Sequence, residues 1–169
     1  MKIIKLEKKH KDDFIYINQD TKQTLENPDF FIGFFSNNEI DEFLKDDKKA
    51  IFYGCLEGEH LIALSGLIFD VEDFYDELTL LNIKLTDCVE IGASMTLLSA
   101  RGKGCMLNIN KELIKIAKAK NIKYLLATAH PNNIASNKSL TNLGMKFIKE
   151  YKRHGYLRNL YIKDLTTLI

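Results

Sequence analysis

The stretch Arg101-Gly102-Lys103-Gly104-Cys105-Met106 decides how the chain folds, because the residues on its two sides have different periodicities. The residues before it are β-rich, and those after it repeat apolar side chains at helical spacing. A basic, glycine-containing turn between a strand and a helix is typical of phosphate-binding sites. The glycines let the backbone approach a ligand closely, and the first helical N–H groups have no partner within the helix. The stretch therefore predicts a phosphate-binding loop.

Two common phosphate-binding loops do not fit this stretch. A Walker loop ends in Gly-Lys-Ser/Thr, whereas here Gly104 is followed by Cys105. The dinucleotide fingerprint has a third glycine three residues after the second, where Leu107 stands in this chain. The pattern that remains is Arg-x-x-Gly-x-(Gly/Ala), to which Arg101 and Gly104 conform and Met106 does not. The other interpretation is an ordinary basic turn that binds nothing.

The sequence around the loop predicts a parallel βαβ unit. Residues 89–97 alternate like a strand, with Val89, Ile91, Ala93 and Met95 on one face and Glu90, Gly92, Ser94 and Thr96 on the other. The following helix has an apolar stripe at Met106, Ile109, Leu113, Ile116 and Ala117. Asn121 suits a left-handed C-terminal cap, and residues 122–129 are short, apolar and β-rich, as in a buried parallel strand.

The rest of the chain predicts antiparallel strands and short helices. The patterns indicate one hairpin from residues 50–56 and 61–69 across the turn 57–60, and another from 145–151 and 156–163 across His154-Gly155. They also indicate an edge strand at 1–6 and helices at 8–19, 39–45, 78–85 and 134–143, with Asn38 and Asn133 as caps and Gly144 as a stop. The fold class is therefore α+β, with a mixed, mostly antiparallel sheet, a parallel βαβ core and flanking helices.

Composition excludes several classes of protein. The 169 residues suit one domain with a sizeable core, and the formal net charge of +1 argues against nucleic acid or an anionic membrane as a partner. The three cysteines lack metal-ligand spacing, so we expect no metal and a reducing compartment. The first residues are too polar for a signal peptide, and no apolar run approaches a membrane span. We therefore expect a cytoplasmic protein.

Between about residues 50 and 165 the order of elements resembles the GNAT superfamily of N-acetyltransferases. The motifs that carry this resemblance are Arg101-x-x-Gly104, Asn133-x-x-Ser136 before Gly144, and the last strand at 158–165. The resemblance implies a single GNAT-like domain over residues 1–169, with a core at 50–165 and a helical part at 1–49 that varies with the acceptor. It implies acetyl-CoA as co-substrate and an amine as acceptor, in a small molecule or a peptide. Dimers are common among such proteins.

The resemblance also implies where acetyl-CoA binds. The two strands of the βαβ unit splay apart at their C-terminal ends, and pantetheine lies in the gap like an extra strand. The pyrophosphate lies on the loop, and two polar side chains face the pantetheine arm from the other strand. The residues expected to bind acetyl-CoA are Met95, Thr96, Leu97, Arg101, Gly102, Lys103, Gly104, Cys105, Met106, Asn133 and Ser136.

Three residues depart from the family pattern. Met106 replaces a small residue of the loop, and Met145 replaces a phenylalanine after Gly144. Leu140 stands where many GNAT proteins have a tyrosine that is thought to protonate the departing thiolate. Because a thiol has a pKa of about 8.5, the thiolate is a tolerable leaving group that water could protonate. The change puts the usual general acid in doubt, but it need not abolish the reaction.

The expected reaction is direct attack of an amine on the thioester in a ternary complex. Such an amine is mostly protonated at neutral pH, so a base must remove a proton. Glu90 is the first candidate, since the alternation puts it on the face of Ser94, and His130 is the second. Tyr161 is a candidate substitute acid. The structural alternatives are an ion pair for Glu90 and a loop-capping role for His130.

Two stretches are candidates for the acceptor site. Phe31 and Phe34 belong to an aromatic run that forms either an acceptor wall or ordinary core. Asp73 and Tyr75 belong to an acidic, aromatic run that either binds a cationic amine or forms a solvated face. Two other functions remain open, a non-catalytic acyl-CoA sensor and an interaction protein that keeps the fold without a ligand.

Overall fold

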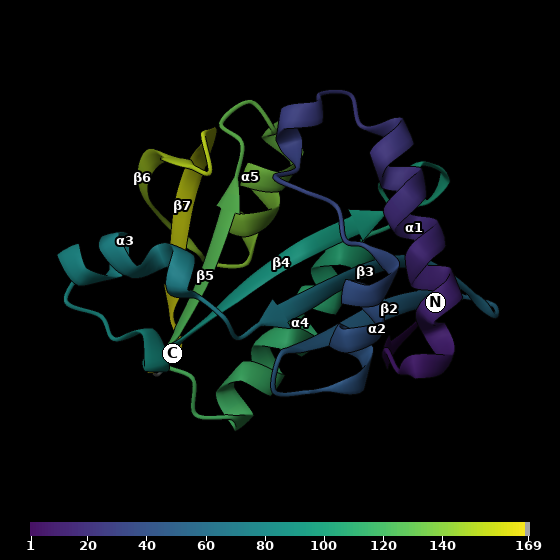
Figure 1. Ribbon diagram of the computed structural model, residues 1–169, viewed down its shortest axis with the longest axis horizontal. Helices are drawn as coiled ribbons and strands as arrows, with labels where there is room; N and C mark the ends of the chain where they lie inside the picture. Colours follow the sequence, from purple (N-terminus) through teal and green to yellow (C-terminus); the bar gives the residue numbers. More distant parts are fainter. Residues whose placement is uncertain (168–169) are drawn as a thin grey trace.

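The computed structural model describes residues 1–167, which form a seven-stranded sheet with helices on both faces (Figure 1). The strands are Lys2–Lys5 (β1), Ala50–Glu57 (β2), His60–Ile68 (β3), Cys88–Thr96 (β4), Tyr124–Ala129 (β5), Lys146–Arg153 (β6) and Tyr156–Asp164 (β7). Their order is β1-β2-β3-β4-β5-β7-β6, and only β4 and β5 run parallel. This topology confirms the predicted α+β class and its mixed, mostly antiparallel sheet.

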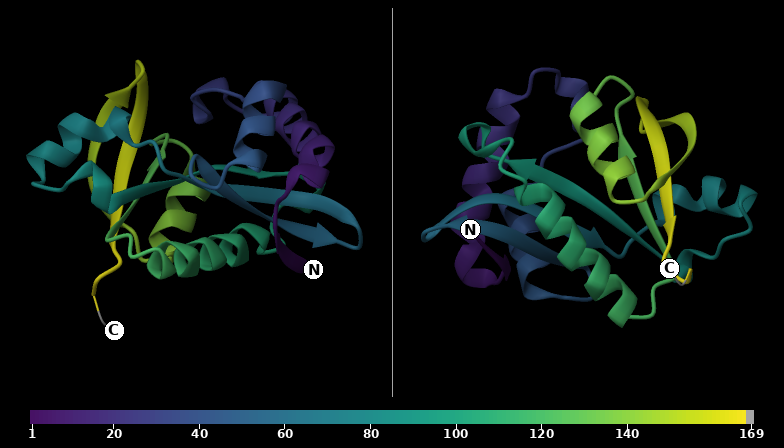
Figure 2. Two further views of the ribbon diagram at one scale, coloured as in Figure 1. Left: turned by 60° about the horizontal axis from the view of Figure 1, so that its bottom comes forward. Right: turned by 180° about the vertical axis from the view of Figure 1, so that it is seen from behind.

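Five α-helices cover the sheet in this part of the chain. They are Lys11–Thr24 (α1), Asn37–Lys45 (α2), Tyr75–Leu80 (α3), Cys105–Ala119 (α4) and Ile134–Asn142 (α5). Helices α4 and α5 lie across one face, as the view from behind shows (Figure 2). On the opposite face, α1 and α2 pack on β2 to β4, and α3 packs on β5 and β7. The sheet is thus buried on both sides.

The local patterns predicted most elements, because each carries its own turn chemistry. The β6–β7 hairpin turns at His154 and Gly155, whose φ angles of 51° and 82° are those of a tight turn that matches the strand twist. Asn121 has the predicted left-handed φ of 60°, and Gly144 ends α5 with a φ of 78°. Asn133 caps α5 by accepting a bond from the Ser136 N–H. These predictions are confirmed.

The predicted alternation of β4 is wrong in its second half, because the strand contains a β-bulge. The pairing with β3 shifts between Leu64 and Gly66, and Ala93 has a φ of 53°. The extra residue reverses which face the following side chains occupy. Met95 is therefore buried against α1 and α2, while Ser94 lies with its hydroxyl 2.8 Å from that of Ser65.

Strands β4 and β5 separate after a short common base. Only the residues from Cys88 to Glu90 pair with β5, although β4 continues to Thr96. A bulge bends and twists its strand, so the one at Ala93 directs β4 away from β5. Figure 1 shows the two strands diverging from this base. The V-shaped gap between them is confirmed.

Several helix predictions need correction. Helix α1 begins three residues later than expected, after a turn in which the Glu7 N–H donates to Nδ1 of His10. The helix expected at residues 78–85 is α3 instead, and it ends before Asn82, whose φ is 56°. Strand β5 begins at Tyr124 rather than at residue 122. The cap of α2 is not Asn38 but Ser36, whose hydroxyl accepts a bond from the Glu39 N–H at 3.2 Å.

Replacing this cap should weaken the packing of α2 on the sheet. We expect Ser36→Ala to lower the free energy of unfolding by about 1 kcal/mol, because the Glu39 N–H loses the hydroxyl that accepts its bond. Urea denaturation of wild type and variant measures the difference. The matched control is Asn38→Ala, which should stay within about 0.5 kcal/mol of wild type. The opposite ranking of the two variants would restore Asn38 as the cap.

Candidate functional site

The gap between β4 and β5 leaves one edge of β4 without a strand beside it. The Leu97 N–H donates to the carbonyl of Ile62 at 3.0 Å, so the backbone groups of Leu97 and Met95 point toward β3. Alternation along the strand then directs the N–H and C=O of Thr96 into the gap. Of the three residues expected to contact pantetheine here, Thr96 therefore offers the free backbone groups. The Met95 side chain belongs to the core on the far face.

The loop before α4 has the geometry that the sequence predicted. Gly102 and Gly104 have φ angles of 78° and 76°, a left-handed conformation that an L-residue adopts only at a cost. The first bond of α4 runs from the Asn108 N–H to the Gly104 carbonyl, so the three preceding N–H groups lie outside the helical ladder. Residues 101–104 are exposed. The loop thus offers N–H groups and the positive end of the helix dipole to an anion.

The two cations of the loop differ in their contacts. Nζ of Lys103 lies 3.0 Å from Oε1 of Glu57, an exposed ion pair with β2. Arg101 forms no ion pair with the residues from 1 to 167. Cys105 contributes only backbone, since its buried thiol lies 3.4 Å from the Met1 sulfur. Burial, reinforced by the contact with Cys105, raises the pKa of the neighbouring Cys55 to about 11. These thiols are packing groups.

Asn137, which sequence analysis did not single out, joins three elements beside the gap. Its Nδ2 donates to the carbonyls of His130 at 2.9 Å and Asn133 at 2.8 Å. Its Oδ1 accepts from the hydroxyl of Tyr161 at 2.7 Å and from Nδ2 of Asn159 at 3.0 Å. Three of these bonds fasten the first turn of α5 to the chain after β5 and to β7, and the bond to Asn133 stays within the start of the helix. The candidate acid Tyr161 is consequently buried, with its proton directed at Asn137.

Glu90 is buried in an ion pair with an arginine of the closing hairpin. Its two carboxylate oxygens accept from Nη1 and Nη2 of Arg153 at 2.8 Å and 3.3 Å. The guanidinium also lies 4.4 Å from the centre of the Phe74 ring. Burial opposes the charge of Arg153, but Glu90 more than offsets this, so the pKa of Arg153 is raised. Because of the bulge, Glu90 and Ser94 do not share a face as expected.

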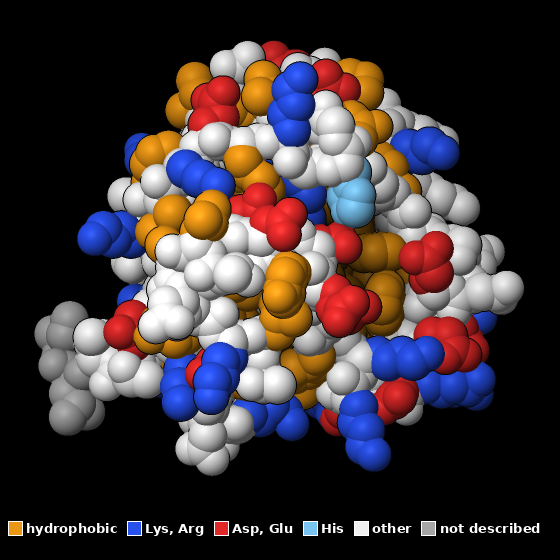
Figure 3. All heavy atoms as spheres, turned by 60° about the vertical axis from the view of Figure 1, so that its left-hand side comes forward, with side chains coloured by type: hydrophobic (Ala, Val, Ile, Leu, Met, Phe, Trp, Pro, Cys, Tyr) orange, Lys and Arg blue, Asp and Glu red, His pale blue; other side chains and the backbone are white. Residues whose placement is uncertain are grey.

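The acidic run is less free to bind a cation than its sequence suggests. Oδ2 of Asp73 lies 2.8 Å from Nε2 of His154 and 3.5 Å from Nη2 of Arg153. The bond from His154, followed by the charge of Arg153, lowers the pKa of Asp73. Tyr75 is 58% exposed at the start of α3. Acidic, basic and hydrophobic side chains are mixed on the face over α3 and β6 (Figure 3), so no single charge dominates there.

His130 lies where β5 meets the gap. Its Nδ1 accepts from the Asn132 N–H at 3.0 Å, which places the proton of the neutral ring on Nε2. The ring lies 5.4 Å from that of Phe30. This geometry supports the loop-capping role, because a nitrogen that already accepts a bond is not free to act as a base.

The aromatic run divides between core and surface. Phe35 packs on Phe14 and Phe43 in the core beneath α1 and α2. Phe31 and Phe34 stack on each other at 4.8 Å and are only half buried. A hollow of about 560 Å³ lies next to this run, between residues 26–30 and the start of α5. The core interpretation is confirmed for Phe35, whereas an acceptor wall at Phe31 and Phe34 stays a prediction.

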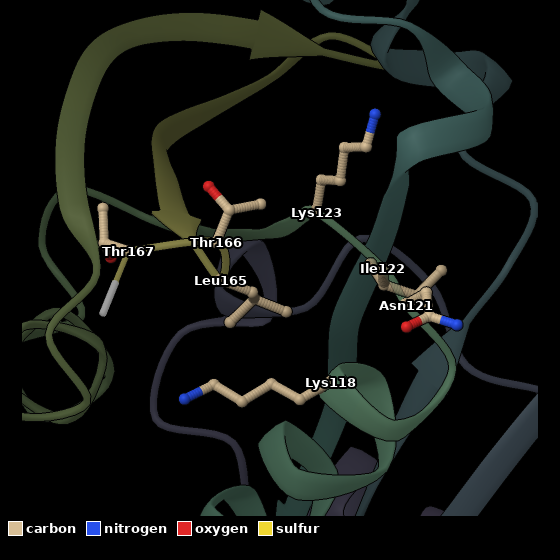
Figure 4. A pocket seen from close by; sticks show the side chains of 7 residues that line it. All are labelled: Lys118, Asn121, Ile122, Lys123, Leu165, Thr166 and Thr167. Atoms are coloured by element: carbon tan, nitrogen blue, oxygen red, sulfur yellow. The ribbon is translucent and has the colours of Figure 1, made fainter. Parts of the chain in front are cut away.

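A second hollow lies away from these groups. It has a volume of about 470 Å³ and is lined by the end of α4, the chain leading into β5 and the residues after β7 (Figure 4). The Lys123 N–H bonds to the Asp87 carbonyl there, at the closed base of the β4–β5 pair. It is therefore at the wrong end of the strands for the loop at Arg101.

No cluster of three or more His, Cys, Asp or Glu side chains in residues 1–167 could hold a metal ion. None of the helices described above is both long and apolar enough to cross a membrane.

No protein-family model and no curated protein matches the sequence. Solved structures do match the fold. An N-acetyltransferase from Staphylococcus aureus Mu50 is similar with a TM-score of 0.76 and 18% identity, over 98% of this chain and 100% of that one. A ribosomal-protein-alanine N-acetyltransferase from Brucella melitensis gives 0.76 and 14%, over 97% and 99%.

A third similar structure, yncA from Salmonella typhimurium, contains its cofactor acetyl-CoA. Its TM-score is 0.76 and its identity 13%, over 97% of this chain and 93% of that one. The TM-scores and coverages establish a common fold over nearly the whole length of each chain. At identities this low they establish the fold alone. The chain therefore has the fold of the GNAT N-acetyltransferases, as the resemblance of its motifs implied.

Proposed function

We propose that this protein is an N-acetyltransferase that transfers the acetyl group of acetyl-CoA directly to an amine in a ternary complex. The observation that carries the proposal is the junction of two features on this fold. The free edge of β4 in the gap leads into a loop whose N–H groups at the start of α4 lie outside the helical ladder. One feature suits an extended amide chain and the other suits a pyrophosphate, and acetyl-CoA contains both.

The residues present fit this co-substrate. Thr96 would bond to the pantetheine amides, and the N–H groups of Cys105 and Met106 would receive the pyrophosphate with help from Arg101. When bound, acetyl-CoA supplies an acetyl group activated as a thioester. Met106 in place of a small residue is half buried, so its side chain does not block the exposed loop. Asn133 is occupied as the cap of α5 and would contribute through the position of that helix.

Glu90 is the best-placed group to take the proton of the amine. Its carboxylate lies along the strand, with Oε1 at 3.3 Å from where a Cβ on Gly92 would stand, and so extends toward the gap. Each carboxylate oxygen has two lone pairs, and Arg153 occupies only one lone pair on each oxygen. Arg153 thus orients the carboxylate while a lone pair stays available. A water molecule can connect it to the amine.

The departing thiolate has no obvious acid of its own. Leu140 packs against the core, so no phenol projects from that position of α5. The Tyr161 hydroxyl is near the same helix but is bonded to Asn137. Protonation by water, or by Tyr161 after a shift of this bond, completes the reaction.

A non-catalytic acyl-CoA sensor is the second candidate. The leucine at position 140 and the ion pair of Glu90 with Arg153 favour it, because both reduce the acid–base groups free in the gap. A sensor binds acetyl-CoA without transferring the acetyl group to any amine. Binding and transfer must therefore be measured separately.

Binding of acetyl-CoA should raise the melting temperature. At about 100 times its dissociation constant a ligand stabilises by about 2.7 kcal/mol, which for a chain of this length is a rise on the order of 5–10 °C. We expect this rise in wild type and a smaller one in Arg101→Ala, measured by differential scanning fluorimetry. Lys111→Ala removes an exposed cation of α4 outside the loop and serves as the control. No rise in wild type would exclude both the enzyme and the sensor.

Removing the proposed base should slow acetyl transfer without unfolding the protein. We expect Glu90→Gln to lower kcat/KM by about 10²-fold or more for the amine that a screen of acceptors selects, because general base catalysis contributes at least that much. Glu150→Gln, on the exposed side of β6, is the control. An unchanged kcat/KM in Glu90→Gln would assign Glu90 to structure alone.

A further inference from the structure

The face of the sheet that carries Glu90 also holds a second arginine, with no acidic partner. Arg158 of β7 is 2% exposed, and its side chain ranks among the largest fully buried ones. Its Nη1 donates to the carbonyl of Leu157 at 2.6 Å, while Nη2 has no hydrogen-bond partner within residues 1–167. Arg158 forms no ion pair with another residue of the range 1–167. A buried charge without a partner is rare, since leaving water is costly unless another group compensates.

Two further donors close to Arg158 are buried without partners. They are the hydroxyl of Tyr151, which stands opposite Arg158 in the β6–β7 ladder, and Nε of Arg153. Burial raises the pKa of Tyr151, so its phenol stays a neutral donor and cannot neutralise the arginine. Three donors thus lack an acceptor on one face of one hairpin. What is missing is a group that accepts hydrogen bonds and carries negative charge.

The neighbouring carboxylates do not fill this role. Glu90 and Asp73 both form ion pairs with Arg153, and Asp73 also bonds to His154. Asp29 attracts Arg158 from the exposed turn before the aromatic run but forms no ion pair with it. Burial, then repulsion by Arg153, lowers the pKa of Arg158. Arg158 is therefore left without a carboxylate of its own, because the nearby carboxylates pair with Arg153.

The position of Arg158 relates this unpaired guanidinium to the gap. Asn159 pairs with Ala129, the last residue of β5, so Arg158 lies level with the chain just beyond that strand. The bond between Arg153 and Glu90 joins its hairpin to β4 across β5. The centre of the half-buried Tyr156 ring lies 5.6 Å from the Arg158 guanidinium, so this ring packs over the guanidinium. The donors thus belong to the region where an acceptor amine would meet the thioester.

We infer that the acceptor is an amino-carboxylate, a molecule that carries a carboxylate close to the amine, and that Arg158 and Tyr151 bind this carboxylate. The inference rests on the proposed function, because it names the substrate of that same site. A carboxylate accepts several hydrogen bonds and supplies the missing negative charge, and a guanidinium matches it in shape. Glu90 then faces the ammonium group of the same molecule, so the two ends meet opposite charges. A polyamine would bring further positive charge to Arg158.

The test uses product-like probes and does not require acetyl transfer. The probes are the Nα-acetyl forms of the common amino acids, each compared with its Nα-acetyl amide, which is neutral at that end. Melting temperatures are measured over a range of probe concentrations at constant ionic strength. In wild type we expect at least one acid to give a saturable rise, with a dissociation constant about 10- to 100-fold lower than that of its amide, as expected for charge-assisted bonds.

The variants assign the effect to the named residues. Arg158→Met should abolish the difference between acid and amide, and Tyr151→Phe should reduce it. Because replacing an unpaired buried charge with an apolar side chain removes a penalty, Arg158→Met should unfold at the same or a higher urea concentration than wild type. Arg158→Lys, which keeps the charge without the planar fork, should retain part of the preference. Lys152→Met, on the exposed side of β6, should leave the preference unchanged.

Three results would overturn the inference. They are no rise with any acid in wild type, equal rises with acid and amide, or a preference that survives in Arg158→Met. Failure here is distinguishable from failure of the proposed function. If acetyl-CoA raises the melting temperature and the acids do not, the enzyme remains and the acceptor class is wrong. If neither raises it, both are wrong.

Discussion

The site depends on the early end of hydrogen bonding between β4 and β5. In a regular parallel pair each strand satisfies the backbone groups of the other, and here that stops after three residue pairs. The bulge at Ala93 belongs to the pairing of β4 with β3, on the edge of β4 that faces away from β5. The separation of β4 from β5 is therefore fixed by the sheet itself. The free backbone of Thr96 needs an outside partner. An extended ligand chain would be such a partner, so the same irregularity in the sheet would provide the proposed binding surface.

Charge on the face opposite α4 and α5 is arranged in two layers. At the rim, Asp73 and His154 pair with each other in contact with solvent. Further in, Glu90 and Arg153 form an ion pair whose two side chains are nearly buried. Exposed pairs contribute little to stability, whereas a buried pair fixes geometry more than it stabilises. The arrangement is consistent with a rim that holds the hairpin turn in place and an interior that recognises a ligand. Arg158 belongs to that interior.

The sequence predicted the parts that depend on neighbours along the chain. The periodicity on each side of Arg101, the cap at Asn133 and the turn at Gly155 all follow from local chemistry. The bulge in β4 could not be predicted, because it is a property of the register with β3. Ser36 and Asn38 are both good caps, and only the geometry of the turn separates them. Asn137 and Arg158 were missed because their roles are set by partners, or by the lack of partners, in distant segments.

The ion pair between Glu90 and Arg153 has a consequence for when the site forms. It joins the central strand to the last hairpin, so the hairpin of β6 and β7 must dock on β5 before the pair can close. Contacts so far apart in the chain form late, because the loop between them loses entropy first. During synthesis the segment from Arg101 through α4 leaves the ribosome well before the C-terminal hairpin. Under the proposed function, the loop that would hold the pyrophosphate is therefore made before the hairpin that would meet the acceptor.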